Sequence, residues 1–290
     1  MSTISIITSP LPDYELIDSG NGFKLERFGP FTLVRPDPQA LWKPVLTSSE
    51  WLKADGRFDH AESGGSWSLS PRIPAEWTIS VGDLSLVVKP STFKHVGIFP
   101  EHISQWTWIR EAIRHANRPI SVLNLFAYTG GATLSAAKEG ASVCHVDSSK
   151  VAVNWAKRNA ELSGLSDAPI RWIVDDVLTF LKREIKRGVK YDAVIMDPPS
   201  FGRGSKGEVW KIEEDCSTLL DLVSKLLSPK PLFVVFNGYA SGYSPIAYQQ
   251  VLSSTFPDAT IERGELCISD TQSRILPAGI TARAIFVEKS

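Results

Sequence analysis

Glycines and carboxylates follow four consecutive strand-like segments of this 290-residue chain. In chain order they are the pair Gly130 and Gly131, then Asp147, then the pair Asp175 and Asp176, and then Asp197. A glycine pair allows a tight turn at the head of a helix, where the backbone can approach a ligand closely. A carboxylate at the end of the following strand can accept hydrogen bonds from both hydroxyls of a ribose. Each feature alone also fits a turn or a helix N-cap, but their order and spacing together indicate a nucleoside site.

The glycine segment after the first of these strands lacks the motifs that hold phosphates. The sequence "FAYTGGATL" (126–134) is not G-x-G-x-x-G, and no G-x-x-x-x-G-K-[ST] occurs. A ribose-binding acid without phosphate-binding chemistry points to a nucleoside cofactor that lacks phosphates, and S-adenosylmethionine fits. Asp175 and Asp176 can take an adenine amino group or cap the helix that begins near Val177.

The elements that must position these residues alternate between strand and helix. From Ser121 onward, apolar strands alternate with amphipathic helices, which predicts βαβ crossovers and a parallel sheet covered on both faces. One helix is expected at about residues 208–227. The last two segments, "TIERGEL" and "TARAIFVEK", alternate in polarity and predict an antiparallel edge hairpin.

The first hundred residues have a different sequence pattern. Two hairpins are predicted, at residues 23–36 and 77–90, with a short helix near residues 48–53. We therefore expect an α/β protein with two parts. Residues 1–100 form a small β-rich (α+β) N-terminal subdomain for substrate recognition or as a lid, and residues 101–290 form the cofactor-binding domain.

The stretch "NLFAYTGGATLSAAKEGASVCHVDSSKVAVNWAKRNAELSGL", followed by "DDV" and "DPPSF", resembles class I S-adenosylmethionine-dependent methyltransferases. Within them it is similar to the large-subunit ribosomal RNA methyltransferases that modify cytosine C5 or guanine N7. The resemblance implies a Rossmann-like, seven-stranded methyltransferase sheet with an antiparallel last strand. Family members with the full layout carry an N-terminal RNA-binding PUA module, and the opening of this sequence does not match one.

The resemblance also implies roles for individual residues. The loop that wraps the methionine part of the cofactor corresponds to Phe126, Ala127, Tyr128, Thr129 and Gly130. The ribose acid corresponds to Asp147, with Ser148 as its neighbour, and the adenine-contacting acid to Asp176, with Asp175 as a substitute. The motif beside the transferred methyl group corresponds to Asp197, Pro198 and Pro199.

The segment "DPPSFGRGSK" (197–206) is expected to be a rigid, non-helical shelf without a sheet partner, because its two prolines fix φ and remove backbone donors. Asp197 can accept the hydrogens of an amine. Phe201 either stacks on a flipped base or packs into the core under the loop. Arg203 and Lys206 are candidate substrate contacts on the rim of the site.

Cytosine C5 becomes nucleophilic only after a cysteine thiolate adds to C6. The family members that use this chemistry place a Ser-Cys-Ser type motif after the fifth strand, where this chain has "FNGYASG" (236–242). Cys144 and Cys267 lie on predicted strands and Cys216 in a predicted helix. A ring or exocyclic nitrogen, which needs no covalent step, is therefore the favoured target.

Composition limits the compartment and the binding partners that we expect. Three scattered cysteines favour a reducing, cytoplasmic location without a disulfide framework or a metal site, and no membrane partner is indicated. A net charge of −1 gives no global attraction to nucleic acid, so an RNA partner must be held by a local patch. The expected function is methyl transfer to a nitrogen of an RNA base, with ribosomal RNA as the expected substrate. Two alternatives stay open: methylation of a protein side chain or small molecule, and a non-catalytic, cofactor-binding RNA assembly factor.

Overall fold

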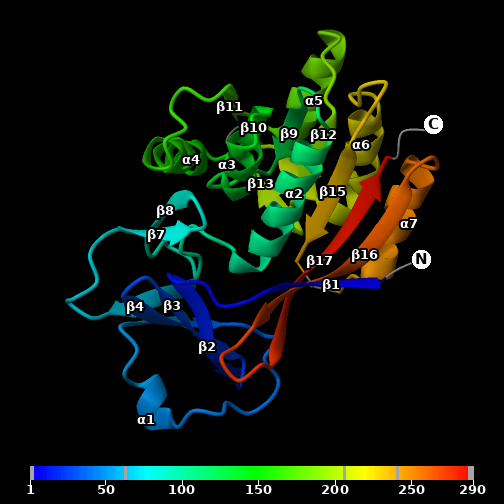
Figure 1. The fold of residues 1–290 in the computed structure, drawn as a ribbon. Helices are drawn as coiled ribbons and strands as arrows, with labels where there is room; N and C mark the ends of the chain where they lie inside the picture. The colour runs from blue at the N-terminus through cyan, green and yellow to red at the C-terminus, as the bar shows by residue number, and fades with distance from the viewer. Residues whose placement is uncertain (1–2, 62–63, 205–206, 240–241, 287–290) are drawn as a thin grey trace. The chain divides into compact units, whose positions relative to one another are not determined.

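The computed structural model describes residues 3–61, 64–204, 207–239 and 242–286, which divide into two compact units (Figure 1). The large unit comprises residues 1–6, 105–265 and 279–290. The small unit comprises residues 7–104 and 266–278. The last two strands, β16 (Thr260–Ser269) and β17 (Ile275–Ile285), contribute residues to both.

An eight-stranded sheet in the order β1-β16-β17-β15-β12-β9-β10-β11 forms the centre of the large unit. The other strands are β1 (Thr3–Thr8), β9 (Ser121–Leu125), β10 (Ser142–Asp147), β11 (Ile170–Val174), β12 (Ala193–Met196) and β15 (Phe233–Gly238). The five strands from β15 to β11 are parallel, and β17 runs antiparallel to β15. The predicted Rossmann-like sheet with an antiparallel last strand is confirmed.

The sheet has one strand more than the seven that were expected, because β1 joins its edge beside β16. Gly264 of β16 makes this close approach possible, since a Cβ there would lie 1.6 Å from the carbonyl oxygen of Ile4. The sequence pattern at the N-terminus did not indicate this pairing.

Helices cover both faces of the sheet. They are α2 (Ile103–His115), α3 (Gly131–Lys138), α4 (Lys150–Leu162), α5 (Val177–Lys186), α6 (Ile212–Ser224) and α7 (Pro245–Thr255). One buried cluster joins alternate strand residues to α5, α6 and α7, and the intervening strand residues join a second cluster with α2 and α3. This period of two is what a strand buried on both faces requires. None of the helices within the described ranges has the length and apolar character that crossing a membrane needs.

The segment after β12 differs from the prediction. Residues 208–211 are not helical: β13 (Phe201–Arg203) and β14 (Val209–Lys211) form an antiparallel hairpin, and α6 begins only at Ile212. Burial of Trp210 explains the difference, because its indole N–H donates to the carbonyl of Pro199 at 2.6 Å. The shelf after Asp197 therefore has a sheet partner, and the expectation that it lacks one is wrong.

The small unit is rich in β-structure, as predicted. Its sheet contains β2 (Tyr14–Gly20), β3 (Phe23–Phe28), β4 (Phe31–Pro36), β5 (Gly56–Ala61) and β6 (Gly64–Leu69), in that order. A second hairpin pairs β7 (Trp77–Val81) with β8 (Leu84–Val88), and the unit also contains the short helix α1 (Ser48–Trp51) and a 3-10 turn at Pro100–His102. Both predicted hairpins and the short helix are present.

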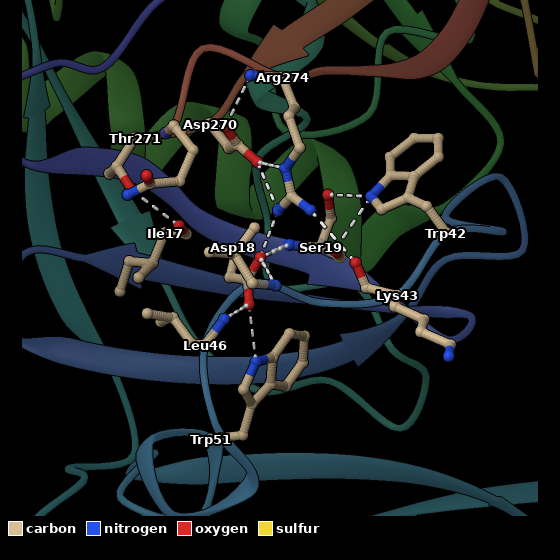
Figure 2. A network of polar contacts seen from close by, with 12 residues as sticks. Ile17, Asp18, Ser19, Trp42, Lys43, Leu46, Trp51, Asp270, Thr271 and Arg274 are labelled. Carbon is tan, nitrogen blue, oxygen red and sulfur yellow. Dashed lines mark hydrogen bonds and ion pairs between the residues drawn. The ribbon is translucent and has the colours of Figure 1, made fainter.

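The carboxylate of Asp18 organises the long connection between β4 and β5 (Figure 2). Asp18 follows a bulge in β2 and is fully buried. It accepts hydrogen bonds from the amides of Val45 (3.2 Å) and Leu46 (2.9 Å), from the indole of Trp51 (2.9 Å), and from the guanidinium of Arg274. Burial alone would raise the pKa of Asp18, but these donors outweigh it and hold the pKa below its usual value.

Replacing Asp18 with asparagine is expected to destabilise the small unit by about 2–4 kcal/mol, because an amide places N–H groups against these donors. A lowered folded-state pKa means that the carboxylate stabilises the fold above the unfolded-state pKa, near 3.9, and that this stability is lost as the pH falls through the folded-state pKa. Denaturant unfolding of the variant at pH 7, followed by tryptophan fluorescence, measures the first effect.

The matched control is Asp59→Asn, in which the lost partner is an ion pair with Arg57 at a half-exposed position. A change below about 0.5 kcal/mol is expected there. If Asp18→Asn unfolded at the same denaturant concentration as the unchanged protein, the organising role of this carboxylate would be wrong.

Candidate active site

The strand register brings the predicted site residues to one edge of the large sheet. Leu125 of β9 pairs with Val146 of β10 on one side and with Met196 of β12 on the other. The next residues along these three parallel strands are Phe126, Asp147 and Asp197. Because neighbouring strands lie about 5 Å apart, these residues form a row at the carboxyl ends of the strands. The chain order of the strands also reverses between β9 and β12, which is where open α/β sheets bind ligands.

The loop between β9 and α3 has a strained backbone. Phe126 (φ 54°), Tyr128 (φ 48°) and Gly130 (φ 89°) all lie in the left-handed region. For a residue other than glycine this conformation costs on the order of 1–3 kcal/mol, and it persists only where the surroundings hold it. Glycine is required at position 131 for a different reason, because a Cβ there would lie 2.2 Å from the ring of Trp106. The glycine pair therefore serves the turn and the packing of α3 against α2.

Hydrogen bonds hold this loop on both sides. The amide of Ala127 donates to the carbonyl of Val146 at 3.1 Å, and the amide of Tyr128 donates to Asp147 Oδ2 at 2.8 Å. The carbonyl of Thr129 accepts from the side-chain amide of Asn159, on α4, at 2.9 Å. Asn159 is 1% exposed, so its contact with Thr129 is shielded from water.

Asp147 links the loop to the start of α4. Its Oδ1 accepts from the amide of Ser149 at 2.8 Å while Oδ2 accepts from Tyr128. Burial raises the pKa of Asp147, and the two amide donors oppose that rise. Each carboxylate oxygen has a second lone pair, so a half-buried Asp147 can still accept from two vicinal hydroxyls. Ser148, the next residue, is also half-buried. This donor set fits the ribose of a nucleoside cofactor.

A chain of buried polar side chains lies beneath the loop. The amide of Asn124 donates to Thr133 Oγ1 at 2.9 Å, and the same hydroxyl is 2.9 Å from Nδ1 of His145. Burial lowers the pKa of His145 to about 3, so the imidazole is neutral at physiological pH. These contacts join β9, α3 and β10 and hold the elements beneath the loop in place.

The two acids after β11 have structural partners. Asp176 is the N-cap of α5, and its Oδ1 accepts from the amide of Thr179 at 2.8 Å. Asp175 forms an ion pair with Arg183. Capping was one of the two interpretations that the sequence left open for Asp176, and it is what this side chain does in the structure. The N-cap requires only one of its two carboxylate oxygens.

Asp197 is half-buried at the end of β12, followed by a buried Pro198 and an exposed Pro199. Phe201 opens β13 with 53% of its surface exposed, so the core-packing interpretation of this ring is wrong. The buried aromatic of the hairpin is Trp210, which packs against Phe126 at a ring-centroid distance of 5.0 Å. The hairpin and the loop between β9 and α3 are thereby in contact.

The predicted substrate contacts differ in what the structure describes of them. Arg203 is exposed, and its guanidinium lies 5.9 Å from the centre of the Phe201 ring. Lys206 lies outside the described residues. Among the side chains that are described, no group of three or more histidines, cysteines or acids is placed to hold a metal ion.

The three cysteines are buried or half-buried. Burial raises the pKa of Cys144 and of Cys216 to about 11. At pH 7 only on the order of one thiol in ten thousand is ionised under those conditions. Neither side chain has the character of an activated nucleophile.

Sequence reasoning missed Asn159, Trp210 and the chain from Asn124 to His145. Asn159 carried a usable signal, because it occupies the buried face of α4 among Ala152, Ala156 and Ala160. An amide on such a face needs a partner. Trp210 carried no comparable signal, since strands of three residues are too short to show a period.

Replacing Asn159 with alanine is expected to weaken the binding of S-adenosylhomocysteine about tenfold, because the freed Thr129 carbonyl loosens the strained loop. Isothermal calorimetry measures this change. Asn154→Ala, at an exposed position of the same helix, is the control and should bind as the unchanged protein does. Equal affinities for both variants would contradict the role given to this contact.

Comparison with known proteins gives consistent findings. A family model described as S-adenosylmethionine-dependent methyltransferase matches residues 51–245. A solved S-adenosylmethionine-dependent methyltransferase from Agrobacterium tumefaciens is 39% identical, with a TM-score of 0.93 over 98% of this chain and 94% of that chain. A methyltransferase crystallised with S-adenosylhomocysteine shares the fold at 18% identity, with a TM-score of 0.73 over 95% of this chain and 76% of that one.

Curated relatives are named as ribosomal RNA methyltransferases. The large subunit methyltransferase K of Neisseria meningitidis is 36% identical over 232 residues, which cover 77% of this chain and 64% of that protein. The methyltransferase K/L of Shewanella frigidimarina is 40% identical over 119 residues, covering 40% of this chain and 16% of that protein. The chain thus spans less than two thirds of the length of these relatives. Its matched residues, fold and site together show that the chain belongs to the S-adenosylmethionine-dependent methyltransferase family.

Proposed function

We propose that the protein transfers a methyl group from S-adenosylmethionine to a nitrogen of a ribosomal RNA base, without a covalent cysteine intermediate. The observation that carries this proposal is the register of the parallel strands. It aligns the ends of β10, β9 and β12, so that Asp147, the 126–130 loop and Asp197 share one edge of the sheet. Asp147 can then bind the cofactor and Asp197 the substrate, from opposite sides of the loop.

The chemistry asks the protein mainly for alignment. S-adenosylmethionine supplies an electrophilic methyl group, and transfer is an in-line displacement in which positioning and exclusion of water lower the barrier. The residues proposed to hold the cofactor are the loop 126–130, Asp147 with Ser148, and Asp176 or Asp175 toward the adenine. At the other end, Asp197 and the adjacent backbone accept the hydrogens of the target amine, and Pro198 and Pro199 keep that position rigid.

Phe201 is proposed to stack on the target base. A ring with 53% of its surface exposed, on a hairpin anchored by Trp210, is available for such a contact. An unstacked base gains about 1–3 kcal/mol from an aromatic platform. Arg203 and Lys206 would then meet the neighbouring phosphates.

Two observations favour the nitrogen over cytosine C5. The segment "FNGYASG" (236–242) at the end of β15 contains no cysteine, and burial keeps the thiols of Cys144 and Cys216 protonated. A nitrogen with a lone pair attacks the methyl group directly and leaves no thioether bond to resolve.

The RNA substrate is inferred from the names of the curated relatives, together with the exposed Phe201 and Arg203. Residues 1–100 are proposed to recognise the substrate or to close over it, and the cytoplasm is the expected compartment. Residues 101–290 are proposed to carry out the transfer.

The test is incubation of the protein with methyl-labelled S-adenosylmethionine and, in parallel, large-subunit ribosomal RNA made by transcription or cell extract. Label in RNA, recovered as an N-methylated nucleoside, is the expected result. Label in protein or in a small molecule would replace the RNA proposal. Cofactor binding with no transfer to any acceptor would indicate a non-catalytic assembly factor.

The nitrogen assignment makes a separate prediction for the cysteines. Cys216→Ser and Cys144→Ala are expected to retain methyl transfer within about threefold, because neither thiol takes part in the reaction. A loss of a thousandfold or more in a folded variant, or 5-methylcytidine as the product, would contradict the mechanism.

A further inference from the structure

Tyr248, on α7, is a buried residue that the proposed chemistry does not yet use. Its side chain is 3% exposed, and its ring stacks on Phe236 of β15 at a centroid distance of 4.4 Å and an interplanar angle of 18°. The ring is therefore held in one place, and the hydroxyl at its end has a fixed position.

Gly238 shows where that hydroxyl lies. A Cβ on Gly238 would come within 2.0 Å of Tyr248 Oη and 2.7 Å of Cζ. The φ of Gly238 is not in the left-handed region, so backbone conformation does not explain the glycine there. The space is needed for the tyrosine, whose hydroxyl touches the last residue of β15.

The same end of β15 lies beside Asp197. Met196 of β12 pairs with Phe236 of β15, so the next residues, Asp197 and Asn237, are neighbours across two parallel strands about 5 Å apart. Gly238 follows directly. The Tyr248 hydroxyl therefore reaches the edge of the sheet at which Asp197 is placed.

The hydroxyl also lacks a hydrogen-bond partner within the part of the chain that the structure describes. Three other tyrosine hydroxyls donate to glutamates: Tyr14 to Glu26, Tyr191 to Glu184 and Tyr243 to Glu213. The Tyr248 oxygen is not among the buried side-chain atoms that lack a partner, so this hydroxyl is open to solvent although its ring is buried. A tyrosine hydroxyl that is open to solvent and unpaired beside Asp197 can bind a ligand.

The Tyr248 phenol is in the ionisation state that a hydrogen-bond donor needs. Burial raises the pKa of Tyr248 well above its usual value, and electrostatic interactions with Cys216 and Asp197 add to the rise. The phenol is therefore neutral and can donate, whereas the carboxylate of Asp197 can only accept. A donor next to an acceptor matches the edge of a base on which an N–H group adjoins a ring nitrogen or a carbonyl.

We propose that the Tyr248 hydroxyl binds the target base by donating a hydrogen bond to the polar atom next to the methylated nitrogen, while Asp197 accepts from that nitrogen. This inference rests on the proposed function and adds a substrate-binding residue to it. The stack on Phe236 fixes the donor before the base arrives, so little conformational freedom is lost on binding.

Tyr248→Phe is the direct test, because it removes the hydroxyl and keeps the ring on Phe236. With transcribed large-subunit ribosomal RNA and saturating S-adenosylmethionine, kcat/KM for the RNA is expected to fall tenfold or more. Affinity for S-adenosylhomocysteine and the melting temperature should be unchanged, since the hydroxyl forms no hydrogen bond with the described part of the protein. Tyr243→Phe, which removes a hydroxyl paired with Glu213 on the surface, is the control and should retain activity within twofold.

A second variant tests whether the Tyr248 hydroxyl lies beside Gly238. Gly238→Ala places a methyl group where the hydroxyl lies, so it should show the same loss of RNA methylation. Equal kcat/KM for Tyr248→Phe and the unchanged protein would overturn this inference while leaving the proposed function intact. Absence of RNA methylation by the unchanged protein would overturn both.

Discussion

The carboxylate of Asp147 is the contact on which the large unit's site depends. One of its oxygens holds the amide of Tyr128 and the other holds that of Ser149, so a single side chain ties a strained loop to the helix that follows β10. The left-handed conformations of Phe126 and Tyr128 each cost free energy, which contacts with the surroundings such as this one must offset. Asn159 provides the second tie, from the opposite side of the loop. The loop is thus shaped before any cofactor binds, which spares the ordering cost of binding.

The strand register extends this local arrangement along one edge of the sheet. Parallel pairing in step from β15 to β10 brings Asn237, Asp197, Phe126 and Asp147 to one level of the sheet. Aromatic contacts then couple the parts: Phe126 packs on Trp210 of the hairpin, and Phe236 stacks on Tyr248 of α7. Each of these residues is consequently placed by a rigid strand end, as alignment-driven catalysis requires.

Much of this could be predicted from the sequence, because the signals are local. Period-two strands, amphipathic helices and the residues at strand tips gave the parallel sheet and the positions of Asp147 and Asp197. What escaped prediction depends on contacts between distant residues. Asp18 and Arg274 are separated by 256 positions, and the pairing of β1 beside β16 joins the two ends of the chain. The β13–β14 hairpin has strands of three residues, too short for a period to show, and only the burial of Trp210 explains why a helix does not begin earlier.

A calorimetric titration with S-adenosylhomocysteine, of the unchanged protein and of Asp147→Ala, tests the central claim most directly. The unchanged protein is expected to bind, and the variant to lose at least a hundredfold in affinity, because it loses the proposed ribose acceptor and the contact with the loop together. The melting temperatures of both proteins, recorded alongside, show whether the variant is folded. Binding by a folded Asp147→Ala variant with unchanged affinity would contradict the account.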